Sequence, residues 1–199
     1  MSATRTTGAG GSTRQRIVEA AYACMARDGI GRLTVEGVTR EAGVARATVY
    51  RTFPGGRDEL IDAAVAWAVG EFFTGLASDI GAVDGIATLL ERGLMAGRRR
   101  LARHDVLQHA LQVEADAVVP ALAPVMPKVL DQLRARLADR LRHERLRPGV
   151  DPAEAADVLA RLALSLIGTP GCWDLDDPTA VHRLVHQHLL AGILADPGQ

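Results

Sequence analysis

Residues 34–53, TVEGVTREAGVARATVYRTF, constrain the fold more than any other part of the chain. Two short helical patterns meet there at Ala42, Gly43 and Val44. Ala42 is small enough for a helix contact, Gly43 tolerates a positive φ, and Val44 can pack the angle between the helices. The segment therefore predicts a helix-turn-helix. These residues alone also allow an ordinary helical hairpin.

The second of these helices, predicted from about Ala45 to Phe53, has two different faces. Val49 and Phe53 can turn inward, and the opposite face carries no bulky apolar side chain. Such a face can enter the major groove of DNA, where side chains reach the base edges. The side chains on that face are Arg46, Ala47, Thr48 and Arg51.

Helical patterns continue on both sides of this unit. A first helix starts at Ser12, which resembles a capping box with Gln15, and stops at Gly29. Near the other end, Asp151 and Asp177 each precede a proline, which is typical of an N-cap followed by the first helical residue. No segment alternates like a strand. The chain is predicted to be all-α, with about nine helices.

Composition narrows the class of protein further. The chain has 199 residues, 48% of them hydrophobic, and a formal net charge of -1, so we expect a globular protein with a core and no polycation. Residues 1–60 carry nine Arg against six acids, which makes this third basic. Cys24 and Cys172 match no disulfide or zinc spacing. The sequence shows neither a signal-peptide pattern nor an apolar run as long as a membrane span. We therefore expect a cytoplasmic protein without membrane contact.

Six short features between residues 13 and 62 occur together in one family of bacterial regulators. They are Asp28 and Gly29; Thr34 and Val35; Ala42, Gly43 and Val44; Thr48, Val49 and Tyr50; Phe53 and Pro54; and Asp58, Glu59 and Leu60. In this order they resemble the tetracycline-repressor (TetR) family. The resemblance implies a three-helix DNA-binding domain, a larger helical domain that binds an effector and dimerises, and release of DNA on effector binding.

We accordingly expect three segments. Residues 1–11 are rich in Gly, Ser and Thr and form a disordered tail. Residues 12–56 form the helix-turn-helix DNA-binding domain, and residues 57–199 form the helical effector-binding and dimerisation domain.

The resemblance also assigns roles to residues that match the family pattern. It gives Tyr50 a contact with a DNA phosphate and makes Thr34 a second phosphate anchor, both of which fix register without reading sequence. The leading turn of the second helix supplies the base readers that we expect, since Arg can pair with guanine and Ala or Thr can touch a thymine methyl. These readers are Arg46, Ala47 and Thr48, and Arg40 and Arg51 fit either role.

The chain departs from the family pattern at three positions. The family commonly has a phosphate-binding Lys three residues after the Phe, but Gly56 stands there, so the contact either moves to Arg57 or is lost. Gly37 occupies a helix interior at a cost of about 1 kcal/mol relative to Ala. Thr39 replaces a small apolar residue, and it either faces DNA or is a tolerated substitution.

The effector side of the sequence is less informative. Large or polar side chains on otherwise apolar helices are the candidates for ligand binding, although each could equally be ordinary core or surface. They are Trp67, Phe73, Met95, Arg99, His104, Gln108, Met126 and Trp173. Because aromatic residues are few, we expect a mostly apolar pocket with one or two polar anchors.

The last two predicted helices carry wide apolar stripes that could form a four-helix bundle between two subunits of a homodimer. The expected interface residues are Val158, Leu162, Leu166, Val181, Leu184, Val185 and Leu189. His182 and His186 lie four residues apart and could share a metal, but the sequence suggests no third ligand, so no metal or other cofactor is expected.

Three classes of function remain. The first is a ligand-responsive regulator, expected to be a repressor, which binds a pseudo-palindromic double-stranded DNA operator and leaves it on binding a small-molecule effector. The second is a helical ligand-binding or interaction protein with a degenerate DNA-binding domain. The third is an enzyme. We do not expect one, because the sequence shows no catalytic nucleophile with a neighbouring general base, no phosphate-binding loop and no cofactor-binding motif.

Overall fold

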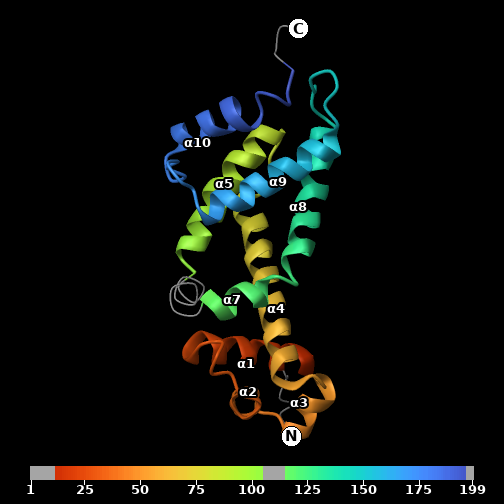
Figure 1. The fold of residues 1–199 in the computed structure, drawn as a ribbon, viewed down its shortest axis with the longest axis vertical. Helices are drawn as coiled ribbons and strands as arrows, with labels where there is room; N and C mark the ends of the chain where they lie inside the picture. Colours follow the sequence, from red (N-terminus) through yellow and green to blue (C-terminus); the bar gives the residue numbers. More distant parts are fainter. Residues whose placement is uncertain (1–11, 105–114, 196–199) are drawn as a thin grey trace, which may run out of the picture. The chain divides into compact units, whose positions relative to one another are not determined.

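The computed structural model describes residues 12–104 and 115–195, and the regular elements in these ranges are helices (Figure 1). The helices are α1 (Thr13–Asp28), α2 (Val35–Ala42), α3 (Arg46–Thr52), α4 (Gly56–Ile80), α5 (Ile86–Ala102), α7 (Ala115–Leu122), α8 (Met126–Leu141), α9 (Pro152–Gly168) and α10 (Pro178–Leu184), with a π-helical turn η1 (Val185–Leu189). This confirms the all-α prediction. The predicted tail at 1–11, most of the helix expected at 106–117, and Gln108 lie outside the described residues.

The helices form two compact units. The first unit holds the described residues 12–69 and 115–124, and the second holds 70–104 and 125–195. The first unit thus reaches beyond residue 56, where the sequence predicts its domain to end. Leu60, Ile61, Ala64 and Val65 in this part of α4 are buried, and none of them belongs to the core of the second unit.

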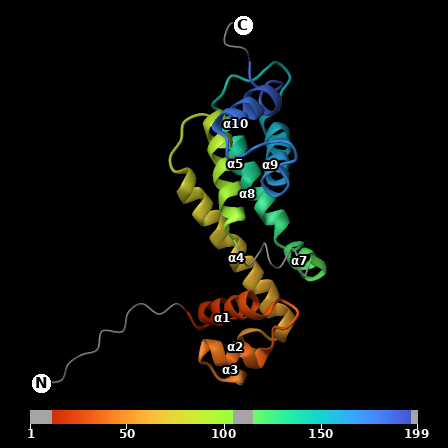
Figure 2. The ribbon, with the colours of Figure 1, turned by 90° about the vertical axis from the view of Figure 1, so that its left-hand side faces the viewer.

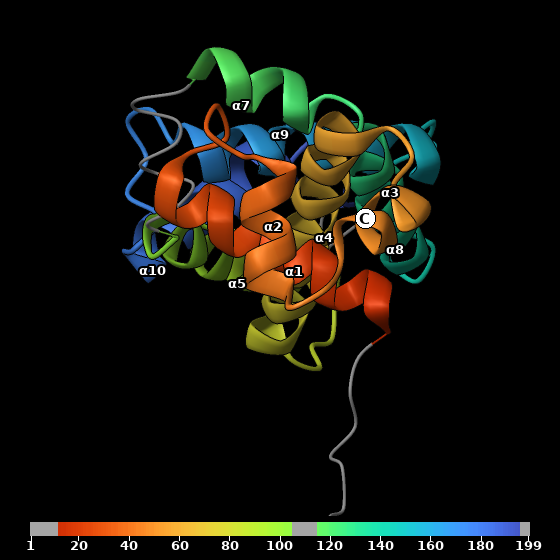
Figure 3. The ribbon, with the colours of Figure 1, turned by 90° about the horizontal axis from the view of Figure 1, so that it is seen from below.

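Helix starts in the first unit follow the capping residues of the sequence. The Ser12 hydroxyl accepts the Gln15 backbone N–H at 3.2 Å and starts α1. The Thr34 hydroxyl accepts the Gly37 N–H at 3.1 Å and starts α2. α1 and α2 then pack against each other (Figure 3). Ile17 of α1 and Val38 of α2 are both fully buried.

The second unit is built on one apolar core. α9 packs against both α5 and α8, and α10 packs against α5 (Figure 2). Leu94 of α5, Leu141 of α8 and Leu159 of α9 are almost completely buried in this core. Asp151 and Asp177 cap α9 and α10 as predicted, because each carboxylate accepts first-turn N–H groups at 2.8–2.9 Å.

Two helical segments have an irregular feature in their interior. The last helix is predicted to run unbroken to about Ala195, but α10 passes into η1 at Val185, where the Leu190 N–H donates to the Val185 carbonyl at 2.9 Å. Such π-helical turns occur mostly as local features of longer helices, often at functional sites. Pro120 lies inside α7, where it lacks the N–H that would donate a helical hydrogen bond.

α4 is long and apolar enough, by length and composition alone, to cross a membrane. The same test is passed by the core helices of soluble proteins. α4 carries Asp62, Glu71 and Asp79 along its length, and Leu60 and Leu76 are buried in the protein. These buried residues account for part of its apolar character, since 28% of its apolar stretch is buried.

Candidate nucleic-acid interface and effector cavity

The turn between α2 and α3 has the geometry that the sequence predicts. Gly43 adopts the left-handed conformation, with φ 63° and ψ 39°, which costs glycine little. Its N–H and that of Val44 both donate to the Thr39 carbonyl, which closes the end of α2. The structure therefore supports the helix-turn-helix over a plain helical hairpin.

α3 separates a buried face from an exposed one. Val49 and Phe53 are fully buried, which anchors the helix in the first unit. Arg46, Ala47 and Arg51 are exposed and Thr48 is half-buried. Tyr50 is 40% exposed, which is high for an aromatic residue and leaves its hydroxyl accessible. The expected base readers and the expected phosphate contact thus share one helix with an accessible surface.

Arg46 already has partners in the absence of DNA. Its Nη1 lies 2.6 Å from Glu36 Oε1, and its Nη2 donates to the Tyr50 hydroxyl at 3.4 Å. The hydrogen bond that Arg46 donates to Tyr50 and the negative charge of Glu36 raise the pKa of the Arg46 guanidinium. Glu36, which was not among the predicted site residues, therefore holds a side chain that the sequence predicts to read DNA.

The other cations of this surface are less constrained. Within the described residues, Arg40 and Arg51 are exposed and make no hydrogen bond or ion pair. Thr39 is half-buried, and its hydroxyl donates to the Glu36 carbonyl at 2.8 Å within α2. Arg40 and Arg51 are thus available to an anionic partner, whereas the Thr39 hydroxyl is engaged with its own helix.

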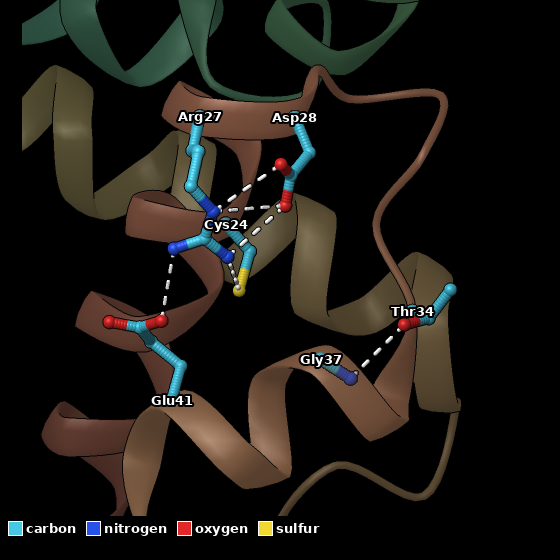
Figure 4. A network of polar contacts seen from close by, with 6 residues as sticks. All are labelled: Cys24, Arg27, Asp28, Thr34, Gly37 and Glu41. Atoms are coloured by element: carbon cyan, nitrogen blue, oxygen red, sulfur yellow. Dashed lines mark hydrogen bonds and ion pairs between the residues drawn. The ribbon is translucent and has the colours of Figure 1, made fainter.

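A polar network fixes α2 against α1 (Figure 4). Arg27 of α1 pairs with Asp28 and reaches across to Glu41 of α2, each at 3.1 Å, and also donates to the Cys24 sulfur at 3.6 Å. The hydrogen bonds to Asp28 and then Glu41 raise the pKa of Arg27. Sequence reasoning missed this pairing, because Arg27 and Glu41 are fourteen positions apart on two helices whose relative placement it does not give.

Arg57 is committed to the backbone of the first unit. Its guanidinium donates to the carbonyls of Leu33 and Ile30 at 2.9 Å and of Gly31 at 3.2 Å. These bonds hold the loop between α1 and α2 against the start of α4. The prediction that Arg57 replaces the family's phosphate-binding Lys is not tested, but three of its donor contacts already go to protein.

The two unexpected glycines have local explanations. Gly56 has φ +66°, a left-handed conformation in which any residue with a Cβ would be strained. At Gly37 a Cβ would lie 3.1 Å from the Thr34 hydroxyl that caps the helix. Glycine therefore fits both positions, which weakens the interpretation that they mark a decayed domain.

The second unit contains an apolar cavity of about 100 Å³. Its walls come from α4, α5, α8 and α9, and Arg136 is the one charged residue among them. The lining includes Phe73, Leu76, Leu90, Leu94, Leu133 and Ile167. The sequence predicts a mostly apolar pocket with one or two polar anchors. This cavity is apolar, and Arg136, whose side chain is exposed, was not among the candidates.

The predicted ligand-binding residues do not come together. Phe73 lines the apolar cavity, whereas Arg99 and His104 line a separate polar pocket with Asp79 and Arg103. The remaining described candidates lie elsewhere. Trp67 packs edge-on against Tyr22 in the first unit, Met95 packs on the core, Met126 starts α8, and Trp173 contacts His188 and Arg183. Size and polarity alone could not show which side chains share a cavity.

The expected dimer stripe divides into buried and exposed residues. Val181, Leu184, Val185 and Leu189 are at most 7% exposed and belong to the core of the second unit. The sequence shows that a stripe is apolar but not whether it covers its own subunit or another. Leu166 is also packed on this core. Val158 and Leu162 of α9, by contrast, are 53% and 41% exposed.

Comparisons with known proteins agree with the helix-turn-helix assignment. Residues 17–64 match the model of the bacterial regulatory proteins, tetR family. A comparison with curated proteins finds no match for this chain.

Solved structures with similar folds cover nearly the whole chain. The TetR family repressor AlkX from Dietzia sp. strain DQ12-45-1b has a TM-score of 0.63 and 21% identity, over 92% of this chain and 98% of AlkX. The repressor QsdR from R. erythropolis has a TM-score of 0.60 and 18% identity, over 94% and 98%. SmeT, repressor of a Stenotrophomonas maltophilia multidrug efflux pump, has a TM-score of 0.57 and 24% identity, over 94% and 95%. At these identities the likeness concerns the fold.

Proposed function

The chain belongs to the TetR family of bacterial regulatory proteins and is a DNA-binding transcriptional regulator rather than an enzyme, and on that premise we propose that it is a homodimeric repressor released from its operator by a small-molecule effector. The observation that carries the proposal is the helix-turn-helix with an exposed, arginine-bearing α3 in a chain that also holds an apolar cavity.

The DNA contacts fall into two groups. Tyr50 and Thr34 bind phosphates and set the register, while Arg46, Ala47 and Thr48 meet base edges in the major groove. Arg40 and Arg51 have no protein partner among the described residues, so they add charge toward the backbone. Arg57 acts within the protein, because its guanidinium binds three carbonyls.

A homodimer gives the symmetry that a pseudo-palindromic operator requires, with half-sites about one helical turn apart. Val158 and Leu162 of α9 support this part of the proposal, since both are large apolar side chains exposed on the same helix. Their spacing of four residues places them on one face of that helix. We propose this face as the centre of the subunit contact.

The effector is a mostly apolar small molecule in this proposal. The cavity between α4, α5, α8 and α9 is lined by apolar side chains, and Arg136, an exposed residue, is the one charged residue in its lining. Its volume of about 100 Å³ is below the roughly 300 Å³ of a drug-sized site, so a larger effector binds only when the helices separate. An effector that binds more tightly when the helices are apart shifts the protein toward that state. One similar structure, SmeT, is a complex with triclosan.

Selection of bound duplexes from a random DNA pool at about 150 mM salt tests the proposal. We expect a palindromic motif whose affinity falls steeply with salt, because phosphate contacts release counterions. The variant Arg46→Ala should lose preference at one base per half-site. Arg142→Ala should bind as the parent does, because Arg142 is an exposed C-cap residue of α8 that pairs with Asp139. A folded dimer that enriches no motif would contradict the proposal and favour the ligand-binding alternative. Screening apolar compounds for release of the selected duplex then tests effector control.

A further inference from the structure

Three metal-ligating side chains meet on the surface of the second unit, away from the apolar cavity. Glu91 comes from α5, His182 from α10 and His186 from η1, and one ligand atom of each lies within 4.8 Å of the other two. Glu91 Oε1 lies 2.8 Å from His182 Nδ1 and 3.2 Å from His186 Nε2. The sequence shows the two histidines at a suitable spacing but not the third ligand, which is 91 positions away from His182.

Buried neighbouring residues hold these three side chains in place. Val181, Leu184 and Val185, which flank the histidines in sequence, are buried in the core of the unit. Leu90 beside Glu91 is buried in the same core. The buried residues therefore fix two helical elements against each other, and the ligands project at their shared edge. The imidazole rings are 4.1 Å apart between centroids, so both face the same carboxylate.

The donor set matches one class of ion. Two imidazole nitrogens and a carboxylate oxygen suit zinc and related late transition metals, and a three-residue set leaves a fourth position for water. In a tetrahedral zinc site with bonds of about 2.0–2.1 Å, neighbouring ligand atoms are about 3.3 Å apart. The two measured separations from Glu91 are close to this spacing. Magnesium and calcium prefer sites made of oxygen ligands.

We propose that Glu91, His182 and His186 form a binding site for a divalent late transition metal, with zinc as its natural class of occupant. The ion joins α5 to the junction of α10 and η1. Both imidazoles then donate lone pairs to the metal, instead of donating protons to a single carboxylate oxygen. The site is independent of the DNA-binding surface, so its presence or absence does not depend on the proposed function.

Calorimetric titration of the chelator-treated full chain with zinc tests the proposal. We expect one zinc per chain, no competition from magnesium, and affinity reduced at least about tenfold by Glu91→Gln and about 100-fold by His182→Gln with His186→Gln. His188→Gln is the matched control, because His188 is an exposed histidine of η1 that contacts Trp173 and not Glu91. Circular dichroism checks that each variant is folded. If the double histidine variant does not fold, the zinc affinity of Glu91→Gln still tests the proposal.

Cobalt provides a second readout of the ligands. Bound Co²⁺ should show visible bands of nitrogen and oxygen ligation without a thiolate charge-transfer band, and the double histidine variant should lose them. A thiolate band would instead assign the metal to a cysteine such as the exposed Cys172 and would overturn the proposal. Zinc binding that survives the loss of both histidines, or no zinc binding by the parent protein, would also overturn it and leave a hydrogen-bonded cluster.

Discussion

Arg46 and Glu36 form an ion pair, with Nη1 2.6 Å from Oε1, across the two helices of the helix-turn-helix. Both side chains are about 60% exposed, so water screens their attraction. The pair holds the proposed base reader in one position before DNA arrives, with the Tyr50 hydroxyl as its second partner. A base edge or phosphate must displace Glu36 or share the guanidinium with it.

The first prediction is that Glu36→Gln tightens operator binding by about two- to fivefold, because it releases Arg46 and removes a negative charge near the DNA. Fluorescence anisotropy with the selected operator measures the change. Glu19→Gln on α1 is the control for charge alone, since Glu19 accepts a hydrogen bond from Gln15 and pairs with no arginine among the described residues. Weaker binding by Glu36→Gln would mean that the ion pair places Arg46 for binding.

The second prediction concerns Arg57. Arg57→Ala should lower the free energy of unfolding by about 1–3 kcal/mol, because three carbonyl acceptors lose a charged donor. Arg57→Lys should lower the free energy of unfolding by a smaller amount, since a lysine cannot reach the same three acceptors in a fixed geometry. Thermal and urea unfolding measure stability, and the operator affinity of the folded variants should stay within about twofold of the parent. A large loss of affinity with unchanged stability would restore the phosphate-binding role.

Local signals in the sequence account for much of the fold. Side-chain caps at Ser12, Thr34, Asp151 and Asp177 were predictable because each involves groups no more than three positions apart. The same holds for the turn at Gly43, where one backbone conformation requires glycine. Such features need no knowledge of tertiary structure.

The features that were not predictable depend on which helices meet. Arg57 reaches carbonyls 24 to 27 positions earlier, and Glu91 reaches histidines of α10 and η1. Spacing along one helix gives the face of a side chain but not its neighbour from another helix. For the same reason, Leu184 looked like an interface residue although it fills the core of its own protomer.

The third prediction separates core from interface. Leu184→Glu should destabilise the protein by more than about 3 kcal/mol, because it buries an unpaired carboxylate in a position that is 2% exposed. Leu162→Glu should leave the protein folded but monomeric, since the side chain is 41% exposed on α9. Thermal unfolding and light scattering distinguish the two outcomes. A Leu162→Glu variant that stays dimeric would move the interface away from α9.

The fourth prediction concerns the close approach of α5 and α9. A Cβ at Gly97 would lie 2.6 Å from Ile167 Cδ1, so Gly97→Ala should overpack this contact and cost about 1–3 kcal/mol of stability. Pairing it with Ile167→Val should recover part of the loss by removing the clashing methyl. Gly93→Ala is the matched control on α5, because its Cβ would meet only Ile80 at an ordinary 3.8 Å. Gly97→Ala, its combination with Ile167→Val, and Gly93→Ala could instead be equally stable. In that case α5 and α9 move apart at little cost to make room for the added methyl group.

The last prediction divides the two roles of Thr34. Its hydroxyl caps α2, and we propose that it also anchors a phosphate, so Thr34→Ala should cost about 1 kcal/mol of stability and weaken binding to all operators alike. Thr34→Ser keeps the hydroxyl and should preserve both properties. Unfolding in urea measures the cap, and binding to the operator and to single-base variants measures the anchor. If Thr34→Ala changes base preference, the hydroxyl reads sequence. If only stability falls, the cap is its whole role, because the remaining folded protein binds DNA as before.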